Sequence, residues 1–101
     1  MHDDPLREAD SELAAEIDTL PPFRVLMHND DYTTMDFVVA VLERIFFKNP
    51  SEATAIMLQI HRRGVGVCGE YPEQIAESKA SAVHRMARER GFPLRCSVEQ
   101  T

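Results

Sequence analysis

The sequence predicts an α/β fold of the α+β type: a single small domain in which a three-stranded sheet packs against three helices, with a disordered N-terminal tail. Its 101 residues, 44% of them apolar, are enough to bury one modest core and too few for a second. Short β-prone runs and amphipathic helical runs follow one another in the order β-α-α-β-α-β, separated by Gly, Pro and Asn. Six such elements in about 80 residues imply an antiparallel or mixed sheet with helices packed on it.

The first strand is predicted over Phe23–His28, which is rich in large apolar and β-branched residues, with Pro22 at its start, where a missing N–H is tolerated. After the segment HNDDYTT, apolar side chains recur at three- and four-residue steps and predict a helix from about Thr34. These side chains are Met35, Val38, Leu42, Ile45 and Phe46. Thr33 stands three residues before Asp36, an approximate capping box that fits this start.

A second helix is predicted after Asn49-Pro50-Ser51, where the proline interrupts the first helix and Ser51 is a plausible cap for the next. Its inward positions are Ala53, Ile56, Met57 and Ile60. Gly64 is expected to end it. The second strand, Val65–Tyr71, contains glycines that predict a β-bulge or the close approach of another backbone.

A third helix is predicted to begin at Pro72 and to end at Gly91. Its acidic residues come early and its basic residues late, which suits the helix dipole. A last strand is predicted over Leu94–Val98. Cys68 and Cys96 lie in apolar runs, without Cys-x-x-Cys spacing or nearby histidines, so we expect both to be reduced thiols in the core.

The formal net charge of -6 is concentrated at the N-terminus. Residues 1–20 hold seven acidic residues and one basic residue, 1 - 7 = -6, whereas residues 21–101 hold ten of each and sum to zero. We therefore predict a flexible acidic extension over residues 1–22 and a folded core domain over residues 23–101. Neither part offers the clustered basic face that phosphate binding requires, so no nucleic acid partner is expected. With no membrane-spanning apolar run and no signal peptide pattern, a cytoplasmic protein without membrane contact is expected.

The segment HNDDYTT, residues 28–34, is more polar than a turn between a strand and a helix requires. Asn and Asp favour turns and acidic residues favour a helix N-terminus, so a purely structural role is one interpretation. A small metal-dependent hydrolase built on Asp30, Asp31 and His61 is a second interpretation. Against it, the chain has no HExxH motif, EF-hand spacing, glycine-rich phosphate loop or G-x-S-x-G motif. We therefore predict no catalytic residue, no metal and no cofactor.

His61 stands four residues after Met57 and so shares a helical face that is otherwise apolar. A histidine in such a place is commonly a core or rim residue. Together with Asn29, Asp30 and Asp31, however, it offers hydrogen-bond acceptors beside flexible apolar side chains. A concave apolar site with a few converging polar groups is typical of a ligand pocket. The pattern favours a ligand in which a compact cation is joined to a hydrophobic side chain.

Four blocks of the sequence resemble the ClpS adaptor family. They are FRVLMHNDDYTTMDFVVAVLERIF, EATAIMLQIHRRGVGVCG, AESKA and GFPLRCSVE, and the match covers nearly all of residues 23–99. The motifs NDDYT-x-M-[DE]-F, M-L-x-[VI]-H-x-x-G and P-L-x-C occur in that family's order and spacing. The resemblance implies a monomeric adaptor, not an enzyme, that recognises N-degrons: proteins with a destabilising N-terminal residue, chiefly Leu, Phe, Tyr or Trp. It would deliver them to the N-domain of a ClpA-type AAA+ unfoldase for proteolysis by ClpP.

The resemblance also implies three groups of site residues. The residues that receive the substrate's α-amino group, directly or through water, are Asn29, Asp30, Asp31 and His61. The residues in the wall of the side-chain pocket are Thr33, Met35, Met57, Ile60 and Leu94. The residues at the unfoldase interface are Gln74, Glu77 and Lys79.

Three positions depart from the family's pattern. Gln74 stands where Glu is expected, which bears on the strength of unfoldase docking, and Thr34 stands where Pro is usual. Ile60 stands where Val is common, and its extra methylene is expected to narrow the pocket. A related domain inside ubiquitin ligases also reads bulky hydrophobic N-termini, but this 101-residue chain shows no ligase region. A plain ribosomal-type interaction domain, the remaining alternative, would bind no peptide through its free amino terminus.

Overall fold

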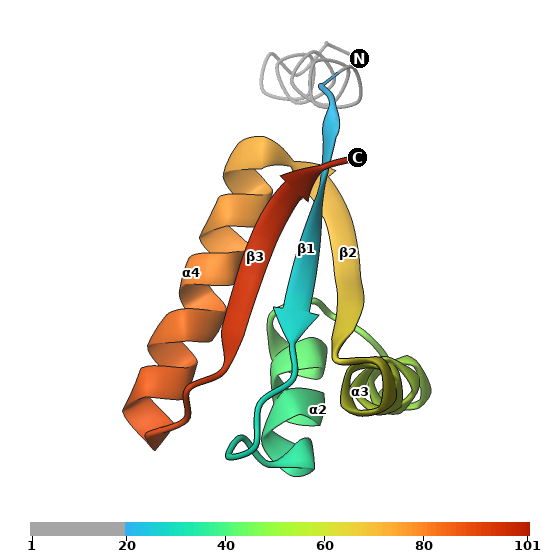
Figure 1. Cartoon of the computed structure of the whole chain (residues 1–101). Helices are drawn as coiled ribbons and strands as arrows, with labels where there is room; N and C mark the ends of the chain where they lie inside the picture. Colours follow the sequence, from blue (N-terminus) through green and yellow to red (C-terminus); the bar gives the residue numbers. More distant parts are fainter. Residues whose placement is uncertain (1–19) are drawn as a thin grey trace, which may run out of the picture.

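The centre of the structure is a three-stranded antiparallel sheet in the order β2-β1-β3. The computed structural model describes residues 20–101 (Figure 1). In chain order the strands are β1 (Pro22–His28), β2 (Val65–Pro72) and β3 (Arg95–Gln100). Both outer strands run antiparallel to β1, which decides between the antiparallel and mixed sheets that the sequence left open. The predicted β-α-α-β-α-β order is confirmed.

The helices of the described residues are α2 (Met35–Arg44), α3 (Pro50–Arg63) and α4 (Glu73–Arg90). α4 packs along β3 and also contacts β1 and β2, while α3 packs between α2 and β2. Figure 1 shows α2 and α3 together at the end of the sheet where β1 finishes. In the part of the chain that the structure covers, no helix has the length and hydropathy needed to cross a membrane.

The ends of all three strands differ slightly from the prediction. β2 extends to Pro72, which was predicted to open the third helix, and β3 begins at Arg95 and not at Leu94. β1 includes Pro22, which pairs with Pro72, and β3 extends to Gln100, which pairs with Phe23. Pairing across the sheet thus sets the strand ends, whereas β-propensity alone had suggested shorter runs. Most of the predicted acidic extension, residues 1–19, lies outside the described residues, and its last predicted residue already belongs to β1.

The caps predicted for α2 and α3, Thr33 and Ser51, were wrong by one and two residues. The Thr34 hydroxyl caps α2 by accepting from a backbone N–H at 3.2 Å. The Thr33 hydroxyl does not cap the helix and instead donates to Asp30 Oδ2 at 2.7 Å. At α3 the side chain of Asn49, not that of Ser51, accepts from the backbone N–H three residues ahead at 2.8 Å. The two threonines have the same cap preference, and Asn and Ser are both strong cap formers, so sequence alone did not separate the neighbouring candidates.

The bulge predicted from the glycines of β2 is confirmed. Val25 pairs with Gly69 and Leu26 pairs with Val67, so Cys68 is an extra residue in β2. A bulge of this kind bends the strand and increases its local twist.

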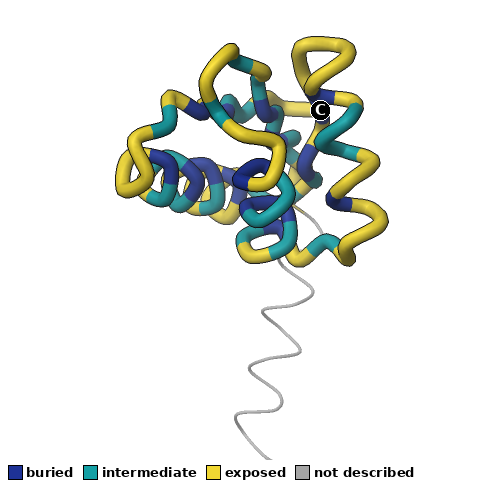
Figure 2. Tube along the Cα trace, turned by 90° about the horizontal axis from the view of Figure 1, so that it is seen from below, coloured by how far each residue is buried: buried dark blue, intermediate teal, exposed yellow. Residues whose placement is uncertain are grey.

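The core fills the space between the sheet and the helices, and Figure 2 shows the buried stretches turned toward the interior. Both cysteines lie in it as free, buried thiols, as predicted. A hydrogen bond with Cys96, together with burial, raises the pKa of Cys68, so its thiol stays protonated. The largest fully buried side chains are those of Met27, Leu42, Ile60, Val25, Val41, Val83 and Cys68.

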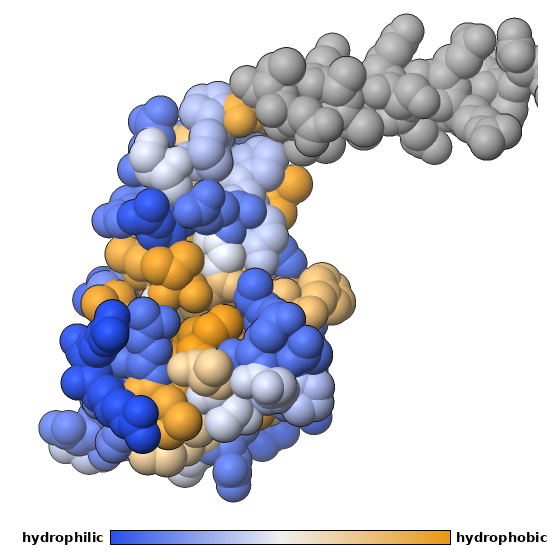
Figure 3. All heavy atoms as spheres, turned by 90° about the vertical axis from the view of Figure 1, so that its right-hand side faces the viewer, coloured by the Kyte–Doolittle hydropathy of each residue, from blue (hydrophilic) through white to orange (hydrophobic). Residues whose placement is uncertain are grey.

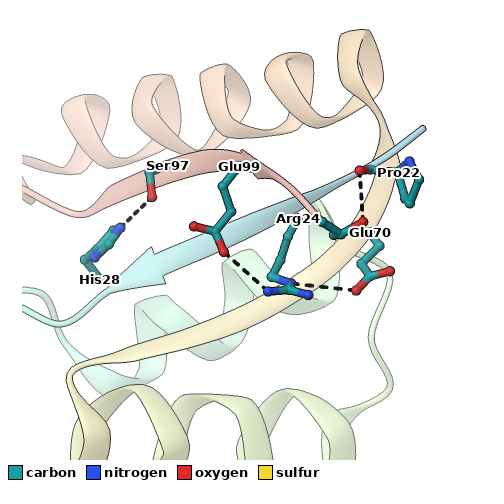
Figure 4. Close-up of polar contacts among 7 residues, drawn as sticks. Pro22, Arg24, His28, Glu70, Ser97 and Glu99 are labelled. Atoms are coloured by element: carbon teal, nitrogen blue, oxygen red, sulfur yellow. Dashed lines mark hydrogen bonds and ion pairs between the residues drawn. The ribbon is translucent and has the colours of Figure 1, made fainter. Parts of the chain in front are cut away.

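The opposite face of the sheet is polar (Figure 4). Arg24 in the central strand lies between two glutamates, with its Nε 3.7 Å from Glu70 and its Nη1 3.3 Å from Glu99. His28 and Ser97 are joined by a hydrogen bond of 2.7 Å. The two ion pairs of Arg24 are partly exposed to solvent, and exposed ion pairs contribute about 0 to 1 kcal/mol each. This face is therefore solvated, and the core lies on the helical side of the sheet.

Candidate functional site

The polar loop after β1, residues 29–34, lies against the C-terminal end of α3. The Asn29 N–H donates to the Gly64 carbonyl at 2.9 Å. Gly64 ends α3 in the left-handed conformation, with φ +87°, which glycine adopts at little cost because it has no Cβ. This hydrogen bond holds the loop beside the last turn of α3, which carries His61.

A cavity of about 240 Å³ is bounded by the polar loop, α2 and α3. Its lining residues are Asn29, Asp30, Asp31, Thr33, Met35, Val38, Met57, Ile60 and His61. The side of the molecule formed by β2 and α3 shows apolar surface set between hydrophilic groups (Figure 3). The structure thus brings together, around one cavity, every residue expected to receive an α-amino group and most of the expected pocket wall.

Two residues distinguish this lining from the predicted set. Leu94 does not line the cavity; it precedes β3 and is buried in the core, where it is 4% exposed. Val38 does line it and was not predicted. The signal for Val38 was present, because it stands three residues after Met35 on the same face of α2. The same periodicity also marks core positions, and Val38 belongs to the core as well.

The Asp30 carboxylate organises the loop from within. Its Oδ1 accepts from the backbone N–H groups of Tyr32 and Thr33, at 2.8 and 2.7 Å, and its Oδ2 accepts from the Thr33 hydroxyl at 2.7 Å. Burial alone would raise the pKa of Asp30, but the hydrogen bonds from Thr33 and Tyr32 outweigh it and lower the pKa below its ordinary value. Asp30 is therefore ionised at neutral pH and contributes negative charge to the cavity wall.

These hydrogen bonds predict a pH dependence of stability. Because the folded state lowers the pKa of Asp30, its contribution is fully present above the unfolded-state pKa of about 4 and is lost as the pH falls through the lower folded-state value. In urea titrations from pH 6 to pH 2.5, the gap in unfolding free energy between wild type and Asp30→Asn should shrink below about pH 4. Thr33→Val removes the hydroxyl that donates to Asp30. It should reduce part of this difference in unfolding free energy. Parallel pH profiles for wild type and Asp30→Asn would contradict this role.

Asn29, Asp31 and His61 differ from Asp30 in that their side chains remain available. All three residues are exposed, and within residues 20–101 no side-chain hydrogen bond engages any of them. They stand at the cavity that Asp30 also lines. An amide oxygen, a carboxylate and an imidazole can together accept several hydrogen bonds from one cationic donor.

The hydrolase interpretation is not supported. No group of three His, Cys, Asp or Glu side chains among the described residues is close enough to hold a metal ion. Asp30, Asp31 and His61 line one cavity without forming such a group.

A second groove, of about 540 Å³, lies between the end of α2 and α4. Gln74 and Lys79 line it, whereas Glu77 is exposed on α4 outside its lining. The Lys79 ammonium donates to the carbonyl of Ile45, the C-cap of α2, at 2.7 Å and lies 4.8 Å from the centre of the Phe47 ring. Lys79 therefore joins α2 to α4, a contact that the sequence pattern did not reveal.

Comparison with known proteins gives one consistent result. The family model described as ATP-dependent Clp protease adaptor protein ClpS matches residues 18–97. The chain is 55% identical over 93 residues to an ATP-dependent Clp protease adapter protein ClpS of Nitratidesulfovibrio vulgaris strain DP4, covering 90% of this chain and 89% of that one. It is 61% identical over 77 residues to the protein of the same name from Desulfatibacillum aliphaticivorans, covering 76% and 74%.

A solved structure gives the same relationship in three dimensions. It is that of Agrobacterium tumefaciens ClpS2 bound to L-phenylalaninamide. The two chains are 33% identical and superpose with a TM-score of 0.78, over 80% of this chain and 98% of the other.

Proposed function

The chain belongs to the ClpS family of ATP-dependent Clp protease adaptor proteins, and from this premise we propose that it binds N-degrons without performing chemistry of its own. Its substrates are proteins with a destabilising N-terminal residue, chiefly Leu, Phe, Tyr or Trp. It delivers them, as a cytoplasmic monomer, to a ClpA-type AAA+ unfoldase that works with ClpP. The observation that carries the proposal is the cavity, in which available acceptors stand next to apolar side chains.

The polar lining suits a free α-amino group. Such a group has an ordinary pKa of about 7.7 to 8.0 and is mostly an ammonium at neutral pH, with three N–H donors. An internal peptide N–H is neutral and offers one donor. Asn29, Asp31 and His61 supply available acceptors and Asp30 adds negative charge, so the site favours the terminal group over the internal one.

The apolar lining suits the first side chain of the same substrate. Met35, Val38, Met57 and Ile60 enclose one side of the cavity, and burying a Leu- or Phe-sized side chain contributes roughly 1.5 to 3 kcal/mol. The relative from Agrobacterium tumefaciens was solved with L-phenylalaninamide, a molecule that combines a free amino group with a Phe side chain. That ligand has both chemical features that the cavity suits.

We assign unfoldase docking to the surface of α4 that carries Gln74, Glu77 and Lys79. Gln74 and Glu77 are exposed. Lys79 is already held by the Ile45 carbonyl, so it acts partly by fixing the shape of this surface. The neutral Gln74 offers no charge to a cationic partner and gives a weaker contact there than a glutamate would.

The proposal is tested by titrating peptides that differ only in residue one. Peptides beginning with Phe, Leu, Tyr or Trp are expected to bind one per chain in fluorescence anisotropy, whereas those beginning with Asp or Gly should bind at least tenfold more weakly, since they bury no large side chain. A peptide with Phe at position two behind Gly is the matched control. Equal affinity for all of these peptides would remove the proposed function.

A further inference from the structure

Gly66 in β2 lies directly against Ile60 in α3. A Cβ atom at Gly66 would stand 2.7 Å from Ile60 Cγ1 and 3.5 Å from its Cδ1. The first distance is shorter than van der Waals contact between carbon atoms allows. Gly66 does not have a positive φ, so what this position requires is space and not a special backbone conformation. The glycine therefore leaves room for Cγ1 of Ile60 beside the strand, whereas Cδ1, the carbon that valine lacks, would lie at ordinary contact distance from a Cβ at position 66.

Ile60 also separates β2 from the cavity. It is 2% exposed, belongs to the core, and lines the cavity at the same time. Its side chain is branched at Cβ, so Cγ1 moves only if χ1 rotates or the helix itself shifts. Core side chains pack closely, and the cavity is the open space beside Ile60. A side chain at position 66 would therefore displace Ile60, or α3 as a whole, toward the cavity.

We propose that Gly66 determines the specificity of the N-degron pocket. It does so as a positioning residue, because it sets where the Ile60 side chain lies. The absence of a Cβ lets Ile60 pack back against β2 and leaves the pocket deep enough for aromatic first residues. This inference rests on the proposed function and adds to it a residue outside the cavity lining. It predicts that the volume at position 66, and not the cavity lining alone, sets which first side chains are accepted.

The test is Gly66→Ala, titrated with peptides beginning with Trp, Phe and Leu. Affinity for Trp and Phe is expected to fall about tenfold more than affinity for Leu, because a hydrophobic pocket discriminates by about that factor for one methylene. Adding Ile60→Val should restore the Trp-to-Leu ratio. A valine can turn its Cβ hydrogen toward the new methyl group without placing a δ-methyl in the cavity.

Gly91→Ala is a matched control, because it distinguishes a change in specificity from a general loss of stability. Gly91 ends α4 with φ +75°, and a Cβ there would meet nothing within 4 Å. Gly91→Ala should lower stability by about 1 kcal/mol through backbone strain and leave the Trp-to-Leu ratio unchanged. Unfolding free energies of Gly66→Ala, Ile60→Val and the double variant give a readout independent of peptide. A non-additive coupling between the two sites is expected, since the residues are in contact.

The outcomes separate this inference from the proposed function. A changed ratio that Ile60→Val restores supports the role of Gly66. Wild-type binding with an unchanged ratio in Gly66→Ala overturns that role and leaves the proposed function in place. A changed ratio that Ile60→Val does not restore also overturns it, because the effect then does not pass through Ile60. A wild-type chain that binds none of the peptides overturns the proposed function itself.

Discussion

Acetylating the α-amino group of a Phe-initiated peptide is expected to weaken its binding to this chain by about 100-fold or more. Acetylation replaces an ammonium with three donors by a neutral amide with one donor. Each hydrogen bond to a charged group contributes about 1.5 to 3 kcal/mol, and every 1.4 kcal/mol is a factor of ten, so losing two such bonds gives this magnitude. The acceptors at the cavity would also lose solvent without gaining a partner.

Variants of the chain locate this effect. Asp31→Asn and His61→Ala are each expected to weaken binding of the free-amine peptide by about tenfold or more, and to change binding of the acetylated peptide much less. Glu89→Gln removes a negative charge from an exposed position on α4 outside the cavity lining, and it should leave both affinities unchanged. Competition fluorescence anisotropy with the wild type and the three variants measures the affinities for both peptides. An acetylated peptide that binds as well as the free one would show that the cavity is not an amine receptor.

Removing the acidic extension is expected to abolish substrate delivery while leaving substrate binding intact. Residues 1–20 carry the whole formal net charge of -6 and too little apolar content to build a core. The resemblance to the ClpS family implies that the unfoldase engages the N-terminal extension during delivery, and we propose the same role here. A chain that begins at Leu20 keeps all of the cavity lining and the Gln74 and Lys79 surface, so peptide affinity and docking should not change.

The measurement is degradation of a Phe-initiated reporter by unfoldase and protease, with the full-length or the shortened adaptor at saturating concentration. The shortened chain should give no stimulation above the unassisted rate. An extension of the same length and composition but in scrambled order is the matched control, and it separates a sequence-specific role from one that needs only length and charge. Equal stimulation by full-length and shortened chains would reduce the extension to a solubilising tail. Loss of peptide binding on shortening would instead mean that the domain boundary is misplaced.

Local patterns predicted the elements of this fold well and their ends less well. The apolar steps that begin at Met35 predicted α2 because a helix that packs on a core repeats every 3.6 residues. The first residue of α2 depends on which threonine caps it: the Thr34 hydroxyl accepts from the helix, while the Thr33 side chain turns to Asp30. Adjacent candidates with similar propensity are distinguished only by such competing hydrogen bonds.

For the candidate site, what the sequence determined and what only the tertiary structure decided can also be separated. By itself, the sequence determined the element order, the acceptor types at Asn29, Asp31 and His61, and the apolar residues beside them. Only the tertiary structure decided that the Asn29 N–H binds the Gly64 carbonyl and that Leu94 lies in the core. It also decided that Ile60 leaves no room for a Cβ at Gly66. The physical reason is that propensity and periodicity act over a few neighbouring residues, whereas these contacts depend on how separate elements pack.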